Sequence, residues 1–226
     1  MKRINIVVEG QTERKFIEKV LEPYFHTINN EIFLFAIPIE TSIGHKGGDL
    51  KFSRYKKRVI ELLTEQDKPI VSSLIDFYKL RNDFPQYENS EKIADKYEKI
   101  HFLENAIKGD IKREIDTYRF LPYIQLHEFE GLLFSDVKGF NAIDDIEKKE
   151  LEEIEKIIKK NPNPELINDG DITSPSKRLL KIIKGYRKKI YGTIIAKEIG
   201  IETIKEKCPH FKEWIDKLIE MSKILE

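Results

Sequence analysis

The sequence is poor in cysteine and has no long apolar run. Cys208 is the single cysteine in 226 residues, which excludes an internal disulfide and a cysteine-rich zinc site and is typical of a reducing compartment. The apolar stretch near the N-terminus is interrupted at Glu9, so it is too short for a signal peptide or a membrane span. We therefore expect a soluble, cytoplasmic protein without a membrane partner.

The sequence also lacks net charge, although charged residues are abundant. Lys and Arg number 40, Asp and Glu number 40, and together they make up 35% of the chain. No global basic field exists to attract nucleic acid, so such a site must be a local patch, or a metal or partner protein must supply positive charge. The length and the 40% hydrophobic content suit one compact domain or one and a half.

Short β-branched runs alternate with helical patterns over the first 80 residues. Residues 4–8, 33–39 and 69–75 are apolar runs typical of strands, whereas 12–21 and 50–66 carry apolar residues at helical spacing. This alternation predicts a parallel sheet with right-handed crossovers.

A further helix and strand complete the predicted sheet. Residues 90–118 have helical spacing, and 120–126 are expected to form a fourth strand, in which Pro122 indicates an edge or an irregular start. We therefore predict an α/β core over residues 1–136, with a parallel sheet of about four strands flanked by helices.

Residues 137–226 are expected to form a helical C-terminal extension packed on this core. Segments 144–160, 176–199 and 212–225 have helical patterns, and the stretch 161–171, rich in Asn and Pro, is typical of a loop.

Carboxylates follow two of the predicted strands. Glu9 ends the first and Asp76 ends the third, and ligands of open parallel sheets bind at the carboxyl ends of the strands. If these strands are neighbours, the two carboxylates need a bridging cation, for which Mg²⁺ with oxygen ligands is suited. Gly10 would let the backbone approach a ligand closely. The alternative is that such acids cap the next helix or face water.

The stretch VEGQTE, residues 8–13, resembles the first motif of Toprim domains, the metal-dependent catalytic fold of topoisomerases, primases and OLD-type nucleases. The resemblance implies a Toprim-like (Rossmann-like) fold. In it Glu9 matches the motif glutamate, a metal ligand or general acid/base, and Asp76 matches the first aspartate of a DxD motif that helps to bind Mg²⁺. Tyr78 stands where the second aspartate is expected, and its hydroxyl is a poor Mg²⁺ ligand. Either the ion is bound weakly, or another carboxylate substitutes, or the chain is not a working nuclease.

More narrowly, the chain resembles an uncharacterised Toprim-like family of prokaryotes related to OLD-type nucleases. Some of its members are encoded beside ABC/SMC-type ATPases. The stretches that carry this likeness are VEGQTE, HKGGDL, IDFYKL, QLHEFEGLLF, PSKRL and CPHFKEW. The resemblance implies Mg²⁺ or Mn²⁺ as cofactor, nucleic acid as substrate, an ATPase partner and a role in prokaryotic defence.

QLHEFEGLLF offers a substitute for the missing aspartate. His127, Glu128 and Glu130 follow the fourth predicted strand and so lie at the same edge of the sheet. An extended backbone would place both carboxylates on one face, whereas a helix would let only one reach the site. Glu130 or Glu128 could complete a metal shell, with His127 as acid/base or phosphate contact. The alternative is a carboxylate paired with lysine and a packed histidine.

The loop after the second predicted strand contains Lys46, Gly47 and Gly48. Consecutive glycines let backbone N–H groups turn toward an anion, and Lys46 adds charge. The loop lacks a full phosphate-loop signature, so ATP binding is not supported. A glycine turn with a solvated lysine is the alternative.

The strongest basic stretch begins at Lys177 and Arg178 and continues to Lys188 and Lys189. A helix here could follow a phosphate backbone or offer Arg178 to a scissile phosphate. A merely solvated basic face is the alternative.

In the stretch CPHFKEW, residues 208–214, the apolar spacing is typical of a helix packed in the core. Cys208 and His210 alone do not make a sufficient metal site.

The leading hypothesis is a Mg²⁺-dependent nuclease whose metal ligands are Glu9, Asp76 and Glu130, with or without self-association. The alternatives are an inactive regulatory or binding subunit, for which Tyr78 argues, and an enzyme that acts on small phosphate substrates.

Overall fold

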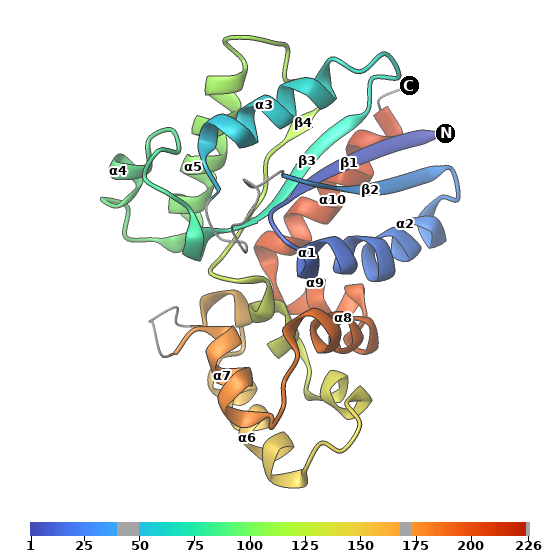
Figure 1. The fold of residues 1–226 in the computed structure, drawn as a ribbon, viewed down its shortest axis with the longest axis vertical. Coiled ribbons are helices and arrows are strands. Elements are labelled where there is room, and N and C mark those ends of the chain that lie inside the picture. Colours follow the sequence, from blue (N-terminus) through green and yellow to red (C-terminus); the bar gives the residue numbers. More distant parts are fainter. Residues whose placement is uncertain (40–49, 168–172, 225–226) are drawn as a thin grey trace.

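The computed structural model describes residues 1–39, 50–167 and 173–224 and contains a parallel β-sheet flanked by helices (Figure 1). The strand order is β2-β1-β3-β4, and β5 also pairs with β3. All of these pairings are parallel, so the predicted fold class is confirmed. The strands are β1 (Lys2–Val8), β2 (Ile32–Pro38), β3 (Ile70–Asp76), β4 (Phe120–Leu121) and β5 (Ile124–Gln125).

Helices connect the strands and make up the C-terminal part of the chain. The α-helices are α1 (Gln11–Phe16), α2 (Glu22–Ile28), α3 (Phe52–Leu63), α4 (Tyr87–Ser90), α5 (Lys96–Ile111), α6 (Lys148–Lys160), α7 (Pro175–Ile182), α8 (Lys188–Ile199), α9 (Ile201–Lys207) and α10 (Pro209–Ile224). A π-helical turn, η1 (Ile17–Leu21), joins α1 to α2. The 3₁₀ turns are η2 (Phe77–Lys79), η3 (Phe129–Ser135), η4 (Val137–Ala142) and η5 (Pro164–Leu166).

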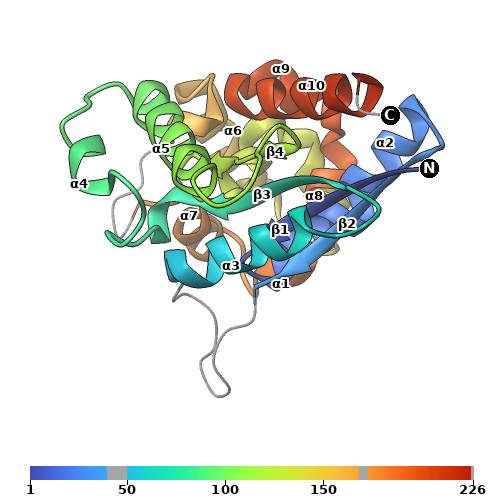
Figure 2. The ribbon, with the colours of Figure 1, turned by 90° about the horizontal axis from the view of Figure 1, so that it is seen from above.

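The sheet is covered on both faces, which explains why residues 4–8 of β1 and all of β3 are buried. Along β1, Ile4 and Ile6 belong to a core that includes α8, α9 and α10, whereas Val7 belongs to a second core with α3 and α5. Figure 2 shows α10 and α3 on opposite sides of the sheet. Trp214 of α10 anchors this helix, because its indole N–H donates to Ser72 Oγ of β3 at 2.8 Å.

The fourth predicted strand is split in two. The structure forms β4 and β5 in place of one strand over 120–126, and Pro122 lies between them. Proline has no N–H to donate to the ladder, which accounts for the break. The backbone N–H of Ile124 donates instead to the Glu104 carboxylate of α5 at 2.9 Å.

Two predicted helices are shorter than expected. The segment 176–199 forms α7 and α8, separated by a turn in which Gly185 has φ +74°, a conformation that favours glycine and ends helices. The segment 90–118 forms α5, which begins after Asp95, whose side chain accepts from Glu98 N, and ends at Ile111.

The C-terminal part is helical, as predicted, and α6 and α7 lie beyond the carboxyl ends of the strands in Figure 1. Within the described ranges, no helix combines the length and the hydropathy needed to cross a membrane.

Candidate functional site

The carboxyl ends of β1 and β3 lie side by side, so Glu9 and Asp76 follow neighbouring strands. Val8 pairs with Leu74 in this parallel register, one residue before Glu9 and two before Asp76. Asp76 is 5% exposed. Its Oδ1 accepts a hydrogen bond of 3.0 Å from the backbone N–H of Phe129, which ties the end of β3 to the segment after β5.

Asp76 is the centre of a group of carboxylates. Burial is the main cause that raises its pKa well above the ordinary value, and negative charges around it add to this effect. Those charges belong to Glu13, Glu130 and Glu9, and we call the four residues the acidic cluster. The Lys188 ammonium acts in the opposite direction. Charge of one sign at a strand end is the electrostatic setting in which a cation binds.

Glu130 is fully buried and has one cationic neighbour in Lys188. Burial raises the pKa of Glu130 to about 7, although the charge of Lys188 opposes this shift. The Lys188 Nζ lies 2.9 Å from Oε2 of Glu130. Oε1 has no hydrogen-bond partner among the described residues. A buried carboxylate oxygen without a partner is costly, and a metal ion would satisfy it.

Glu13 reaches the cluster from the first turn of α1 and is buried. A Cβ atom added to Gly10 would lie 2.8 Å from Oε2 of Glu13. The backbone of Gly10 is extended, with φ −138°, a conformation open to any residue, so a side chain at this position would have to displace the end of the Glu13 side chain. Gly10 therefore leaves room for the carboxylate of Glu13. The expected close approach of a ligand to the backbone of Gly10 stays a prediction.

Glu128 and His127 point to other partners. Glu128 is extended and accepts two hydrogen bonds of 3.0 Å from Ser176, one from the backbone N–H and one from Oγ, so it caps the start of α7. His127 is buried with φ +62°, and its Nε2 lies 2.9 Å from Lys96 Nζ. The chain therefore turns sharply between β5 and η3, and Glu128 and Glu130 diverge.

The remaining sequence candidates lie elsewhere. Lys46, Gly47 and Gly48 fall outside the described residues. Lys177 is exposed at the start of α7. The guanidinium of Arg178 donates through Nε to the backbone carbonyl of Thr173 at 2.6 Å. This hydrogen bond fixes the residue pair that immediately precedes α7 to the first turn of the helix.

Sequence reasoning missed Glu13 and Lys188 as members of the site. Glu13 lies in the VEGQTE motif, four residues after Glu9, so the motif itself carried the signal. Lys188 was one of many basic residues in its stretch, and nothing in the spacing indicates that α8 brings it to Glu130.

The carboxylates of the acidic cluster are not among the described side chains whose ligand atoms lie close enough together to bind one metal ion. Across the described ranges, the set of three side chains whose ligand atoms all lie within 4.8 Å of one another consists of His101, His210 and Glu213, on the α10 side of the sheet. The acidic cluster offers carboxylate oxygens suited to Mg²⁺ or Mn²⁺, and a bound ion would have to draw them together.

Comparison with known proteins gives one match. No curated protein and no solved structure matches the chain. A family described as "Domain of unknown function (DUF4276)" matches residues 8–219, which contain the whole acidic cluster. The protein therefore belongs to the DUF4276 family.

Proposed function

We propose that this protein is a Toprim-type, metal-dependent nuclease that hydrolyses phosphodiester bonds of DNA or RNA. The observation that carries the proposal is the position of Asp76, buried at the carboxyl end of β3 and surrounded by the charges of Glu13, Glu130 and Glu9. Open parallel sheets bind their ligands at this edge. The resemblance of VEGQTE to the first Toprim motif supports the same site.

The residues fit Mg²⁺ or Mn²⁺ as cofactor. Asp76, Glu9 and Glu130 would hold the ion, and the unpartnered Oε1 of Glu130 supports this assignment. Glu13 would replace the missing second aspartate, since it is buried beside Asp76. When bound, such an ion lowers the pKa of water and offsets the charge of the scissile phosphate. Lys188 would add positive charge at the same edge.

The substrate and the setting of the reaction are part of the proposal. With no net charge over the whole chain, the protein would bind nucleic acid through a local patch that includes Lys177 at the start of α7, or with the help of a partner. We propose an ABC/SMC-type ATPase as that partner, in the cytoplasm of a prokaryote and in defence, and association of copies of the chain is compatible with this role.

A non-catalytic regulatory subunit is the second candidate, and a different observation favours it. Glu130 has an ion pair with Lys188, and Asp76 accepts from Phe129 N, so part of the acidic cluster is satisfied without an ion. Tyr78 in place of a carboxylate points in the same direction.

The test is cleavage of labelled single- and double-stranded DNA and RNA with Mg²⁺ or Mn²⁺. We expect Asp76→Asn and Glu13→Gln to lower the rate by about 100-fold or more, which is the scale of losing a group that stabilises the transition state. Glu153→Gln, which changes an exposed carboxylate on α6, serves as the matched control and should cleave like the wild type.

Three outcomes would contradict the proposal. Cleavage that survives Asp76→Asn would place the activity elsewhere. Absence of cleavage by the wild type, together with absence of Mn²⁺ binding in calorimetry, would favour the regulatory subunit. Hydrolysis of mononucleotides but not of oligonucleotides would indicate a small phosphate substrate.

A further inference from the structure

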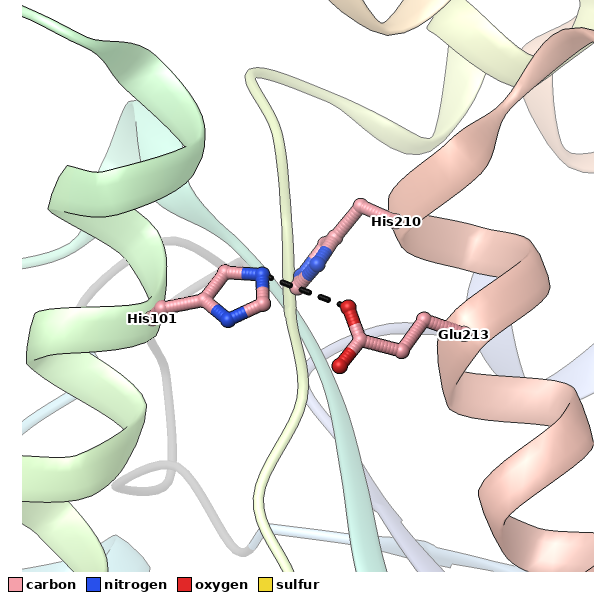
Figure 3. A group of neighbouring side chains, drawn as sticks. All are labelled: His101, His210 and Glu213. Carbon is pink, nitrogen blue, oxygen red and sulfur yellow. Dashed lines mark ion pairs between the residues drawn. The ribbon is translucent and has the colours of Figure 1, made fainter.

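Two histidines and a glutamate meet between α5 and α10, away from the acidic cluster. His101 comes from α5, and His210 and Glu213 come from the first turns of α10 (Figure 3). Their ligand atoms all lie within 4.8 Å of one another. His210 and Glu213 are three residues apart, so they share one face of the helix. His101 Nε2 and Glu213 Oε2 are 3.4 Å apart, close to the roughly 3.4 Å that tetrahedral bonds of about 2.1 Å to Zn²⁺ would require.

His210 supplies independent evidence for a ligand. It is 4% exposed, and its Nδ1 is buried without a hydrogen-bond partner among the described residues. Its Nε2 lies 3.1 Å from Oε1 of Glu104. In metal sites a histidine commonly holds a carboxylate with one ring nitrogen and the ion with the other. The imidazole of His210 therefore has one nitrogen held by Glu104 and one without a partner among the described residues.

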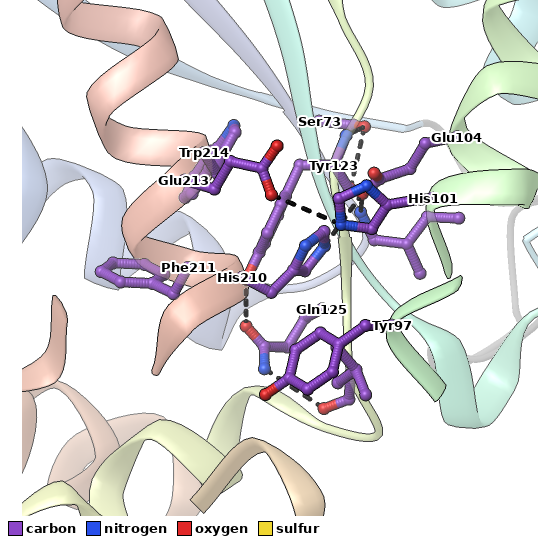
Figure 4. Close-up of polar contacts among 12 residues, drawn as sticks. Ser73, Tyr97, His101, Glu104, Tyr123, Gln125, His210, Phe211, Glu213 and Trp214 are labelled. Atoms are coloured by element: carbon purple, nitrogen blue, oxygen red, sulfur yellow. Dashed lines mark hydrogen bonds and ion pairs between the residues drawn. The ribbon is translucent and has the colours of Figure 1, made fainter. Parts of the chain in front are cut away.

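The position of the His210 ring is fixed before any ion binds. The ring stacks on Tyr123 with centroids 4.8 Å apart and planes 20° apart (Figure 4). The backbone N–H of His210 donates to the buried carboxylate of Glu165 at 3.0 Å. Glu104, in turn, accepts from the backbone N–H of Ile124. Supporting contacts of this kind orient a ligand and raise the affinity of a site.

Glu213 is placed to bind through one oxygen. Its Oε1 lies 2.5 Å from Lys217 Nζ, whereas Oε2 faces His101. A cavity of about 430 Å³ lies beside the site and is lined by His101 and Glu104. Water from this cavity could take a fourth position, which three protein ligands would leave open.

We propose that His101, His210 and Glu213 bind a divalent transition-metal ion of the zinc class. Imidazole nitrogens select Zn²⁺, Co²⁺ or Ni²⁺ over Mg²⁺, so this site and the acidic cluster would take different ions. The ion would join α5 to α10 across the edge of the sheet. This site is absent from the sequence interpretation because His101 is distant in sequence from the other two ligands.

The test is calorimetric titration of the metal-stripped full chain with Zn²⁺ at about pH 8, where unbound imidazole is mostly neutral. We expect one ion per chain, and an affinity lower by about tenfold or more in His101→Ala and Glu213→Gln. Both side chains are 39% exposed, so these variants should fold, which circular dichroism would verify. Co²⁺ should give a visible absorption spectrum that His101→Ala loses.

His26→Ala is the matched control, because His26 forms a surface pair with Glu22 at 2.8 Å. It should bind Zn²⁺ like the wild type, and so should Asp76→Asn, which separates this site from the proposed nuclease site. Unchanged affinity in His101→Ala, or loss of binding in His26→Ala, would overturn the proposal.

Discussion

At the end of β3, two buried carboxyl groups, Asp76 and Glu130, have raised pKa values because burial disfavours their charged forms. Lys188 counters this effect with one positive charge, 2.9 Å from Glu130. The neighbouring carboxylates Glu13 and Glu9 add to the negative charge, so a single lysine does not balance it. Without a metal ion, the folded protein can reduce this negative charge by binding protons.

The stability of the metal-free protein should fall as the pH rises from about 4.5 to 7. Glu130 has a pKa of about 7 in the folded chain and 4.5 as its ordinary value, so the folded state binds the proton more tightly in this window. The free energy of unfolding then decreases with rising pH, by at most roughly 3 kcal/mol from this group. Urea denaturation in a chelator, over a series of pH values, measures the slope.

Glu130→Gln should make this pH dependence shallower, while Asp76 retains its share in the same direction. Glu153→Gln on the exposed face of α6 should keep the slope of the wild type. A variant of Glu130 with an unchanged slope would show that Glu130 is ionised and satisfied in the folded protein.

At the scale of the elements, close contacts position the helices around the site. Gly139 of η4 packs against α8, where an added Cβ would lie 2.5 Å from Ile199 Cγ1 and 2.8 Å from the backbone oxygen of Ile195. Helix α8 also contains Gly192. A Cβ atom added there would lie 3.4 Å from the ring of Phe129 and 3.5 Å from the methyl group of Thr12. The packing of α8 thus sets where Lys188 at its start reaches Glu130.

Gly139→Ala should destabilise the protein by about 1–3 kcal/mol, because the new methyl group has no space and the neighbouring backbone must move. Thermal or urea unfolding measures the loss. Gly109→Ala in α5 is the matched control, since no atom lies within 4 Å of its added Cβ. That variant should gain roughly 0.5–1 kcal/mol from helix propensity. Equal effects of the two changes would contradict the packing argument.

The regular elements were predictable where local patterns decide the structure. β1 and β3 contain the short buried runs that precede Glu9 and Asp76, and their parallel pairing follows from the alternation with helices. The break after α7 required the left-handed conformation of Gly185, which a helical pattern of apolar residues conceals. The turn at His127, with φ +62°, likewise sends Glu128 to Ser176, and no spacing rule indicates it.

At the scale of the whole molecule, long-range contacts join the sheet to the C-terminal helices. Residues of β1 share one apolar core with α8, α9 and α10. The division of the chain at residue 136 stays a prediction. Both candidate sites depend on such contacts, because Lys188 and His210 come from the C-terminal helices, whereas Asp76 and His101 come from the first half. Sequence patterns report only on residues within a few helical turns of one another, so the contacts between these distant residues could not be predicted.

Glu165 links three distant parts of the chain. It is fully buried, accepts from the backbone N–H groups of His210 and Phe211 at the start of α10, and receives the hydroxyl of Tyr97 from α5. Glu165→Ala would leave these donors unsatisfied, so we expect a loss of roughly 2–4 kcal/mol. Asp95→Ala, which removes an exposed cap of α5, should cost about 1 kcal/mol.

Urea unfolding followed by Trp214 fluorescence and by circular dichroism measures both variants and tests whether the transitions coincide. A smaller loss in Glu165→Ala than in Asp95→Ala would contradict the assigned role of Glu165.

The hydrogen bond from Trp214 to Ser72 spans 142 residues of sequence. During translation at about 5–20 residues per second, β3 leaves the ribosome roughly 7–30 s before the helix that covers its face. For that interval the nascent sheet carries an open apolar surface. We therefore expect chaperones to bind the growing chain, and truncated chains that lack α10 to aggregate.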